Sequence, residues 1–477
     1  MTTFLRRLAS SAVLLFVAAS TAYAQEPRVG VDTRVELMSI IFRLAGNPEY
    51  GQGSLPGYNK AIDAHFGAFK DHPAIRLARQ LREASGVSFD AVMSMAIHVE
   101  DAYSLKERVP FDRPGIALDA RWKGAQARKF LEAARQFVVD AKFREFVQSQ
   151  QPLYDVANER LRALVTKSVD LAWFNKFFGR PPGASFVLVP GLANGGGSYG
   201  PKFRAADGAE EDYAIAGVWN VDGEGKPTFP QGLVGTIVHE FNHSFANPLV
   251  EQHAAALEKS GARMFAAVAD AMRSQAYGDG ETVLKESLVR ACAARYALAH
   301  EGEQAAANAV QYERRRFFLW TPELVDLLGE YEKDRARYPS LADFMPRIVG
   351  FFDGLAPRVE GMAGKFEASR PRVVSMTPLN GSENVDPALG EIVVRFSRPM
   401  KPASYSVMQT KGKEAFPQVF GVAFDETGTV FTLRVRLEPG RTYEFSLNSV
   451  GGGAFQSAEG TPLAGYPVRF RTAAAKK

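Results

Sequence analysis

The spacing of apolar residues along the chain predicts regions of different structure. From residue 30 to about 170 apolar residues recur at helical spacing, most clearly over 122–147. Two compact apolar runs, 185–190 and 213–221, then predict strands on either side of a glycine-rich loop. Helical spacing returns from 232 to about 352. This part of the chain is therefore predicted to be mainly helical with a small sheet.

The C-terminal part follows a different pattern. Short apolar or alternating runs at 391–396, 430–437 and 442–447 are separated by turn residues, as at 438–440. Several short strands with turns between them are typical of a β-sandwich of about 100 residues. We therefore predict an all-β domain over 371–473.

The sequence of this all-β domain resembles the bacterial Ig-like module of surface-layer proteins. The likeness rests on four segments, 375–378, 381–385, 394–400 and 470–472, and extends over the whole domain. Modules of this kind act as spacers or adhesion domains. The resemblance therefore implies an Ig-like sandwich but no chemistry.

The N-terminus adds a targeting signal to this picture. Two arginines precede an apolar run over 12–19, and Ala22 and Ala24 place small residues where a signal peptidase reads them. The apolar run is too short to span a bilayer. We therefore expect residues 1–24 to be a cleaved signal peptide and the mature protein to be periplasmic or secreted.

Charge and cysteine content exclude several classes of function. Two of the 57 basic residues lie in the expected signal peptide, which leaves 55 against 53 acidic residues. With this near balance and no basic block, neither nucleic acid nor an anionic membrane surface is expected as a partner. No later stretch is long and apolar enough for a membrane span. Cys292 is the only cysteine, which excludes an internal disulfide and a cysteine-rich zinc site.

The segment His239-Glu240-Phe241-Asn242-His243 carries the clearest chemistry. Two histidines four residues apart lie on one face of a helix, one turn from each other, so both imidazoles can reach a single metal ion. Glu240 projects beside that ion, where it can act as a general base toward a zinc-activated water. The alternative is a pair of surface histidines beside a solvated glutamate, and the apolar residues around the motif argue against it.

The helix that carries this motif is predicted to begin near Gly232 and to end at Asn247-Pro248. Apolar residues give it a wide buried side, while Gly235 and Ala246 lie near the histidines. A buried helix with small residues beside the metal leaves room for a substrate.

The motif resembles that of the zincin metallopeptidases. A longer string over 239–248 also looks like that of an uncharacterised family of bacterial secreted proteins, and this likeness spans about residues 30–365. The metzincin branch is excluded, because Ala246 and Leu249 stand where it needs a glycine and a third histidine. The resemblance therefore implies the gluzincin branch, in which a glutamate from a following helix completes the zinc site.

Glu286 is the best candidate for that third ligand. It lies on a strongly helical segment with apolar residues on its own face, so its carboxylate should lie near the core and need a partner. The alternative is an ion pair with Arg290, four residues later. Arg290 can also serve both purposes, as an outer partner that holds a metal-binding carboxylate. Glu281 and Glu303 are the reserve candidates.

The resemblance to zincins also implies a hydrogen-bond donor for the developing oxyanion. Tyr199, after the glycine-rich loop, and Tyr296, on the helix of Glu286, are the candidates, and the alternative for each is a packed tyrosine. The strand over 213–221 is expected to be the edge strand against which an extended peptide pairs. The remaining histidines show no ligand spacing and are expected to be structural or at the surface: His65, His72, His98, His253 and His300.

Together the patterns and resemblances predict an α+β protein in two domains. A mainly helical, zincin-like metallohydrolase domain with a small sheet covers 25–368, and it divides into an N-terminal helical part (25–170) and a metal-site part (171–368). The all-β Ig-like sandwich over 371–473 follows it.

The predicted function is that of an exported zinc metallopeptidase. It would bind Zn²⁺ through His239, His243 and Glu286 and use Glu240 as the general base on a peptide or protein substrate. One alternative is a non-catalytic cell-surface or binding protein with a structural or vestigial metal site, which the presence of Glu240 disfavours. Another is zinc-dependent hydrolysis of a non-peptide bond, for instance in a cell-wall component.

Overall fold

The computed structural model describes most of the chain. The described residues are 27–52, 54–179, 184–275, 277–402, 404–448 and 454–474. The expected signal peptide over 1–24 lies outside them. Among the helices described, none combines the length and hydropathy needed to cross a membrane.

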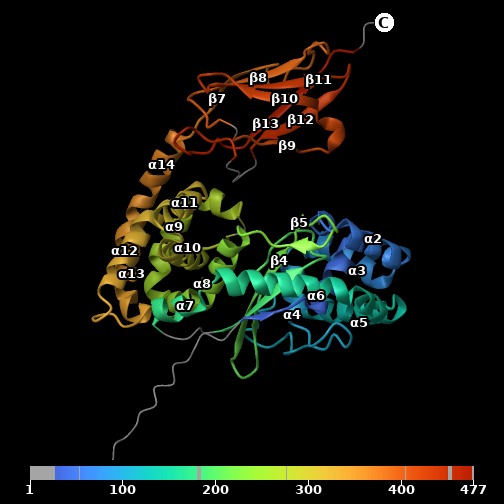
Figure 1. Ribbon diagram of the computed structural model, residues 1–477, viewed down its shortest axis with the longest axis vertical. Coiled ribbons are helices and arrows are strands. Elements are labelled where there is room, and N and C mark those ends of the chain that lie inside the picture. The colour runs from blue at the N-terminus through green and yellow to red at the C-terminus, as the bar shows by residue number, and fades with distance from the viewer. Residues whose placement is uncertain are drawn as a thin grey trace, which may run out of the picture.

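A small mixed sheet lies between two groups of helices (Figure 1). Its strands run in the order β1 (Arg28–Val29), β2 (Ser185–Gly191), β4 (Glu210–Gly217) and β3 (Lys202–Arg204). The first three are parallel, and β3 is antiparallel to β4. A short hairpin of β5 (Asn220–Val221) and β6 (Pro227–Thr228) follows β4.

Both faces of the sheet are buried, each against its own group of helices. Val187 and Val189 belong to a core that includes the N-terminal helices. Phe186 and Leu188 belong to a second core that includes the later helices. Because successive residues of a strand point to opposite faces, a strand that is buried on both sides reads as an unbroken apolar run. This is the physical reason for the run at 185–190.

The N-terminal helices cover one face of the sheet. They are α1 (Thr33–Leu44), α2 (Pro56–Phe66), α3 (Pro73–Ser85), α4 (Asp90–Ile97), α5 (Gly124–Asp140) and α6 (Phe143–Ser168). The apolar stripe over 122–147 is divided between α5 and α6 rather than lying on one helix. The break falls at Lys142, whose φ of 49° is left-handed and cannot occur inside a continuous α-helix.

The later helices form the second core, in which α8 packs on the other face of the sheet and carries the His-Glu-x-x-His motif. They are α7 (Leu171–Phe178), α8 (Leu233–Gln252), α9 (Ala254–Arg273), α10 (Gly280–Glu301), α11 (Glu303–Arg315), α12 (Thr321–Lys333), α13 (Leu341–Leu355) and α14 (Val359–Ser369). Helix α10 packs against α8 on one side and forms a hairpin with α11 on the other. This arrangement brings the predicted ligands of α8 and α10 face to face.

The prediction that the motif helix ends at Asn247-Pro248 is wrong. Helix α8 continues through Pro248 to Gln252. A proline inside a helix costs about 3 kcal/mol, because it removes a hydrogen bond and crowds the preceding turn. Leu249 and Val250 are both fully buried beyond it, and burial of each contributes roughly 1.5–3 kcal/mol. Packing of the last turn therefore outweighs the local preference to stop.

The expected edge strand is also placed differently. The run 213–221 is divided between β4 and β5, and β4 lies inside the sheet. On its outer side it pairs with β3 and, through a bridge between Tyr199 and Ile215, with the segment that precedes β3. The outer edge of the described sheet is therefore formed by residues 199–204, because strand order depends on tertiary contacts that a local pattern does not contain.

The C-terminal part is all-β. One sheet has the order β10 (Gln418–Phe424), β11 (Val430–Arg436), β8 (Glu391–Phe396) and β7 (Val373–Thr377), and the other has the order β13 (Tyr466–Arg471), β12 (Thr442–Leu447) and β9 (Val407–Gln409). Inward side chains of both sheets, such as Ile392 and Phe470, form one core. Figure 1 shows these strands as a separate block at the end of α14. The chain is thus mainly helical with a small sheet and then strand-rich, as expected.

Candidate metal centre

The fold of α8 directs its two histidines toward α10. On the opposite side of the helix, Phe241 stacks on Phe186 of β2, with ring centroids 3.8 Å apart. One turn later, Phe245 stacks on Phe178 of α7 at 4.6 Å. These aromatic contacts fix the rotation of α8, so that His239 and its partner one turn later share the remaining face.

Three donor side chains meet at this face. The Nε2 atoms of His239 and His243 lie 3.2 Å apart. From α10, the two carboxylate oxygens of Glu286 lie 3.5 Å from His239 Nε2 and 3.6 Å from His243 Nε2. Donors bound tetrahedrally to zinc at about 2.0–2.1 Å are about 3.3–3.4 Å from one another. The two imidazole nitrogens have nearly this separation, and each faces a different oxygen of Glu286, so the three side chains can approach one zinc ion.

The tautomer of His243 also suits a metal ligand. Its Nδ1 atom lies 3.1 Å from the side-chain oxygen of Asn247, one helical turn later. An amide oxygen only accepts hydrogen bonds, so Nδ1 carries the proton and Nε2 keeps its lone pair for the site. Burial lowers the pKa of His243, which also favours the neutral, ligating form.

The ligand set is not sealed in the core. The side chains of His239, His243 and Glu286 are 20%, 14% and 11% exposed to solvent, respectively. A structural zinc site is closed by four protein ligands, whereas a catalytic one has three and keeps an open position. The three donor side chains are therefore partly accessible rather than enclosed.

Glu286 is held by a buried arginine as well as by the histidines. Arg290, whose side chain is 1% exposed, donates to Glu286 Oε2 at 2.7 Å and pairs with Glu313 of α11. Burial opposes the ionisation of Glu286, but a hydrogen bond from His239 and the positive charge of Arg290 outweigh it. The pKa of Glu286 therefore lies well below its ordinary value, and the group is a carboxylate.

Glu240 lies beside the histidines in a different environment. One of its oxygens and one nitrogen of each histidine lie within 4.8 Å of one another. Burial raises its pKa, in contrast to that of Glu286. The loop before β3 passes so close that a Cβ at Gly200 would lie 2.6 Å from Glu240 Oε2. Glycine at position 200 therefore leaves the space that the Glu240 carboxylate occupies.

A cavity of about 740 Å³ opens beside Glu240. One wall is the N-terminal half of α8, including Gly235, Thr236 and His239, and the other is the hairpin of α10 and α11. Gly235 and Thr236 are exposed and small. Gly235 was expected beside the histidines from the sequence, whereas Ala246, also expected there, is buried and does not line the cavity. The volume lies in the range of binding sites for small molecules or short peptide segments.

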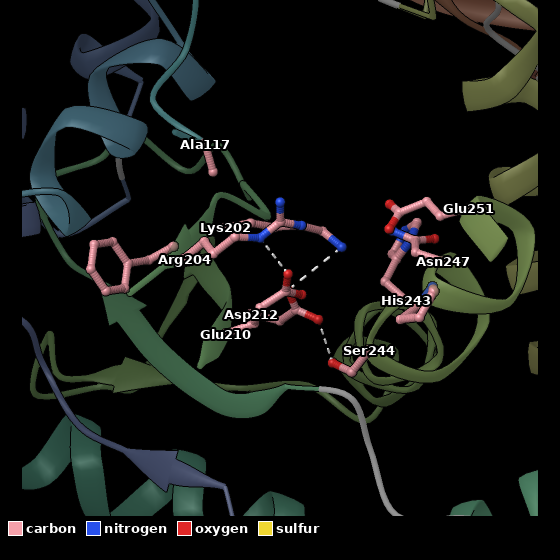
Figure 2. Close-up of a pocket in the computed structure, with 11 residues that line it drawn as sticks. Ala117, Lys202, Arg204, Glu210, Asp212, His243, Ser244, Asn247 and Glu251 are labelled. Atoms are coloured by element: carbon pink, nitrogen blue, oxygen red, sulfur yellow. Dashed lines mark hydrogen bonds and ion pairs between the residues drawn. The ribbon is translucent and has the colours of Figure 1, made fainter. Parts of the chain in front are cut away.

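A second, much smaller pocket lies at the other end of the ligand set, between α8 and the strands β3 and β4 (Figure 2). Its volume is about 50 Å³. Within it Ser244 Oγ donates to Asp212 Oδ2 at 2.6 Å, and Lys202 Nζ lies 3.5 Å from Asp212 Oδ1. The contact between Ser244 and Asp212 joins α8 to β4 and helps to hold the helix against the sheet.

Neither tyrosine expected to assist catalysis has its hydroxyl at the ligand set. Tyr199 lies on the loop, but its hydroxyl is beside Gly197, and the charges that act on it are those of Glu49 and Asp90 in the N-terminal part. Tyr296 borders the cavity, yet its hydroxyl accepts a hydrogen bond from the backbone N–H of Asp170 at 2.7 Å. These placements favour the alternative of packed tyrosines.

Tyr277 is the tyrosine that the structure brings to the site instead. It lines the cavity with His239 and Glu240, and its hydroxyl oxygen accepts from Arg290 at 2.8 Å. Its hydrogen therefore remains free to donate, and burial raises its pKa so that it stays protonated. No local signal marks this residue, because it reaches the site only through the packing of α10.

Two further residues of the site were missed by the sequence reasoning. Asn247 stands four residues after His243, and this spacing on one helix could have revealed it as a partner of the imidazole. Glu313 comes from α11 and had no such signal. The reserve ligands lie elsewhere: Glu281 pairs with Lys285 at the surface, and Glu303 is exposed at the start of α11.

The other histidines lie outside the site and have structural contacts. His72 caps α3 through its Nδ1 atom, and His98 is buried with Nδ1 2.7 Å from a backbone oxygen. Backbone oxygens also lie within hydrogen-bond distance of the imidazoles of the other three: His65, His253 and His300.

Comparisons with known proteins divide the chain into two parts. Residues 28–351 match the model of the Domain of unknown function (DUF4932). Residues 367–472 match that of a bacterial Ig-like domain, which confirms the predicted module. No curated protein matches the chain.

Solved structures similar to the chain include those of the surface layer protein SbsC. Its domains 1–6 are 13% identical, with 54% of this chain and 35% of that chain covered. Its N-terminal part is 12% identical, with 54% and 60% covered. The chain thus spans about a third of the length of the first structure. The TM-score is 0.17 in both comparisons, so nothing is inferred from them about fold or function.

Proposed function

The chain belongs to the family of the Domain of unknown function (DUF4932), and from its candidate metal centre we propose that it is an exported zinc-dependent hydrolase acting on peptide bonds. The observation that carries this proposal is the meeting of His239, His243 and Glu286 at 3.2–3.6 Å, with Glu240 beside them at the wall of a cavity. No comparison supplies a reaction, so the proposal rests on geometry and chemistry.

Zinc would be held by the two imidazoles of α8 and the carboxylate of Glu286. When bound, it supplies Lewis acidity, which lowers the pKa of a water and polarises a carbonyl. Asn247 orients the imidazole of His243, and Arg290 keeps Glu286 ionised and in place. The chain thus supplies both the ligands and the side chains that fix their orientation.

Glu240 is the proposed general base. Its position next to His239 places its carboxylate at the cavity, where a water and the substrate would lie. We propose that it takes a proton from the attacking water and delivers it to the leaving amine. Two carboxylates at one centre then have separate roles: Glu286, beside Arg290, stays ionised, while Glu240, whose pKa is raised by burial, can carry a proton.

Tyr277 is the proposed donor to the developing oxyanion. Its hydroxyl oxygen is held by Arg290, and its proton can point into the cavity. A positioned donor of this kind stabilises charge that appears only in the transition state. Tyr277 thereby takes the role that the sequence had suggested for Tyr199 or Tyr296.

The non-catalytic alternative receives less support. A purely structural metal site has no use for a base, and its ligand set would be closed. The all-β domain fits an extracellular or surface protein, and we propose that it acts as a spacer or adhesion module for the catalytic domain. Hydrolysis of a non-peptide bond would use the same residues. Assays with peptide and non-peptide substrates distinguish this activity from proteolysis.

The proposal is tested by metal analysis of the purified protein together with cleavage of peptide libraries. We expect about one zinc per chain, cleavage by the native protein, and cleavage reduced by several orders of magnitude in Glu240→Gln with zinc content unchanged. Glu251→Gln is the matched control, since Glu251 lies on α8 and pairs with Lys285. A folded, zinc-supplied protein that binds no zinc would contradict the proposal.

A further inference from the structure

The cavity wall opposite α8 carries two arginines without an acidic partner. Arg315 and Arg316 end and follow α11, and both border the cavity. Among the described residues, no carboxylate lies within ion-pair distance of either guanidinium. Both lie over the ring of Tyr312, at 5.8 and 5.7 Å from its centroid. Two like charges beside one ring repel each other, and the ring compensates only part of this.

Arg316 is held in this position. Its Nε atom donates to Gln275 Oε1 at 2.7 Å, and Gln275 Nε2 donates back to the carbonyl oxygen of Arg316 at 3.0 Å. This reciprocal contact fixes the backbone and the near side of the guanidinium. A charged group that is oriented in advance loses less entropy when it binds a partner.

The end of a helix alone does not account for this arrangement. Basic residues are favourable in the last turn because of the helix dipole, and Arg314 satisfies that rule: it lies in the same turn, outside the cavity lining, and contacts Gln311. What distinguishes Arg315 and Arg316 is their place on the cavity wall.

Apart from Glu240 at the metal centre, the acidic groups of the cavity are either engaged in an ion pair or distant from Arg315 and Arg316. Glu313 pairs with Arg290, which also holds Glu286. Glu301 borders the other end of the cavity, where α10 turns into α11. Arg316 follows Glu313 by three residues. It therefore lies about one helical turn, roughly 5 Å, beyond Glu313 and farther from Glu301. Along the hairpin of α10 and α11, the cavity wall is therefore basic at the end of α11 and acidic where α10 turns into α11.

We infer that the cavity selects peptides that carry a carboxylate, either an acidic side chain or a free C-terminus, and that Arg315 and Arg316 bind this group. The guanidinium fork matches a carboxylate with two parallel hydrogen bonds. The inference rests on the proposed function, because it names the substrate class of the same site.

The test measures binding rather than cleavage. The probes are fluorescent heptapeptide libraries with blocked ends, random neutral residues and either Glu or Gln at the central position. A third library has central Gln and a free C-terminal carboxylate, which separates the two sources of charge. The zinc-loaded Glu240→Gln protein binds them without cleaving them, and fluorescence anisotropy gives the dissociation constants.

We expect at least one of the two carboxylate libraries to bind roughly tenfold more tightly than the neutral one, as a charge-assisted contact of ordinary strength gives. Adding Arg315→Gln and Arg316→Gln should abolish this preference, whereas adding Arg314→Gln, the matched loss of charge outside the cavity, should preserve it. Zinc content and thermal unfolding should be the same in the Glu240→Gln protein and in the two variants built on it.

Two results would overturn the inference: equal or undetectable binding of all libraries, or an equal loss of preference on Arg314→Gln, which would indicate a diffuse field. The native protein could instead bind no zinc and cleave no peptide while the carboxylate preference still depends on Arg315 and Arg316. That result would contradict the proposed function and leave this inference standing. Failure of the two is therefore distinguishable.

Discussion

Replacing Glu286 by glutamine tests the third ligand directly. The substitution keeps the size of the side chain but removes its charge, and with it the strongest reason for a metal ion to bind between α8 and α10. Both carboxylate oxygens lie within 3.6 Å of a histidine nitrogen, so both would contribute to the site. Arg290 keeps its contact with Glu313 in the variant, so the fold should survive.

The expected effect follows from the position of the carboxylate. Loss of a group that only orients a ligand weakens metal binding about 10–100-fold, and loss of the ligand itself should weaken zinc binding by at least about 100-fold. At saturating zinc, this removes about 2.7 kcal/mol of the stabilisation that zinc gives to the folded state. For a domain of this size, the increase in Tm caused by zinc should therefore be roughly 3–5 °C smaller in Glu286→Gln than in the native protein.

The assay is competition for zinc against a chromophoric chelator, with thermal unfolding in the presence and absence of zinc. Glu281→Gln is the matched control, because Glu281 lies on the same helix, is exposed, and pairs only with Lys285 among the described residues. An affinity for zinc within twofold of the native value in Glu286→Gln would refute the assignment. The third donor would then be sought in Glu240, which lies within reach of both histidines.

Three further predictions concern single residues. Tyr277→Phe should lower kcat about 10–100-fold, with zinc content and KM little changed. Tyr296→Phe should leave kcat near the native value. Steady-state kinetics and metal analysis measure these quantities. Asn247→Ala should weaken zinc binding about tenfold, measured by chelator competition, because His243 loses the partner that fixes its ring. Glu36→Gln should remove a pH dependence of folding: burial raises the pKa of Glu36 from 4.5 to about 7, so its contribution to stability is complete below pH 4.5 and is lost as the pH rises through 7. Denaturant unfolding between pH 4.5 and 8 should show a decline of up to about 3 kcal/mol in the native protein that the variant lacks, and an equal decline in both would contradict this assignment.

The parts of the structure that the sequence predicted are those that depend on local periodicity. Two histidines at i and i+4 share a helix face in any α-helix, so the placement of His239 and His243 needed no tertiary information. The strand over 185–190 and the all-β C-terminal part likewise follow from runs of apolar residues. Glu286 was placed near the core because its own helix face is apolar, and the structure confirms that this residue is buried.

The parts that escaped prediction depend on contacts between elements. Whether 213–221 is an edge or an internal strand is decided by the chain that pairs beside it, and residues 199–204 take that place. The cavity forms only because α11 folds back along α10, so Tyr277 and Glu313 have no local signal. Pro248 gave a wrong local signal, since burial of the residues after it outweighed its cost.

Glu286 shows how two interpretations of one carboxylate can hold together. From the sequence, the carboxylate could pair with Arg290, bind a metal ion, or do both with Arg290 as its outer partner. A carboxylate has two oxygens and about four lone pairs, and here Oε1 faces His243 while Oε2 faces both His239 and Arg290. The arginine therefore holds the carboxylate ionised and oriented, as the outer partner of a ligand does. The ion pair with Arg290 and the contacts with both histidines therefore occur together, and the first does not prevent the second.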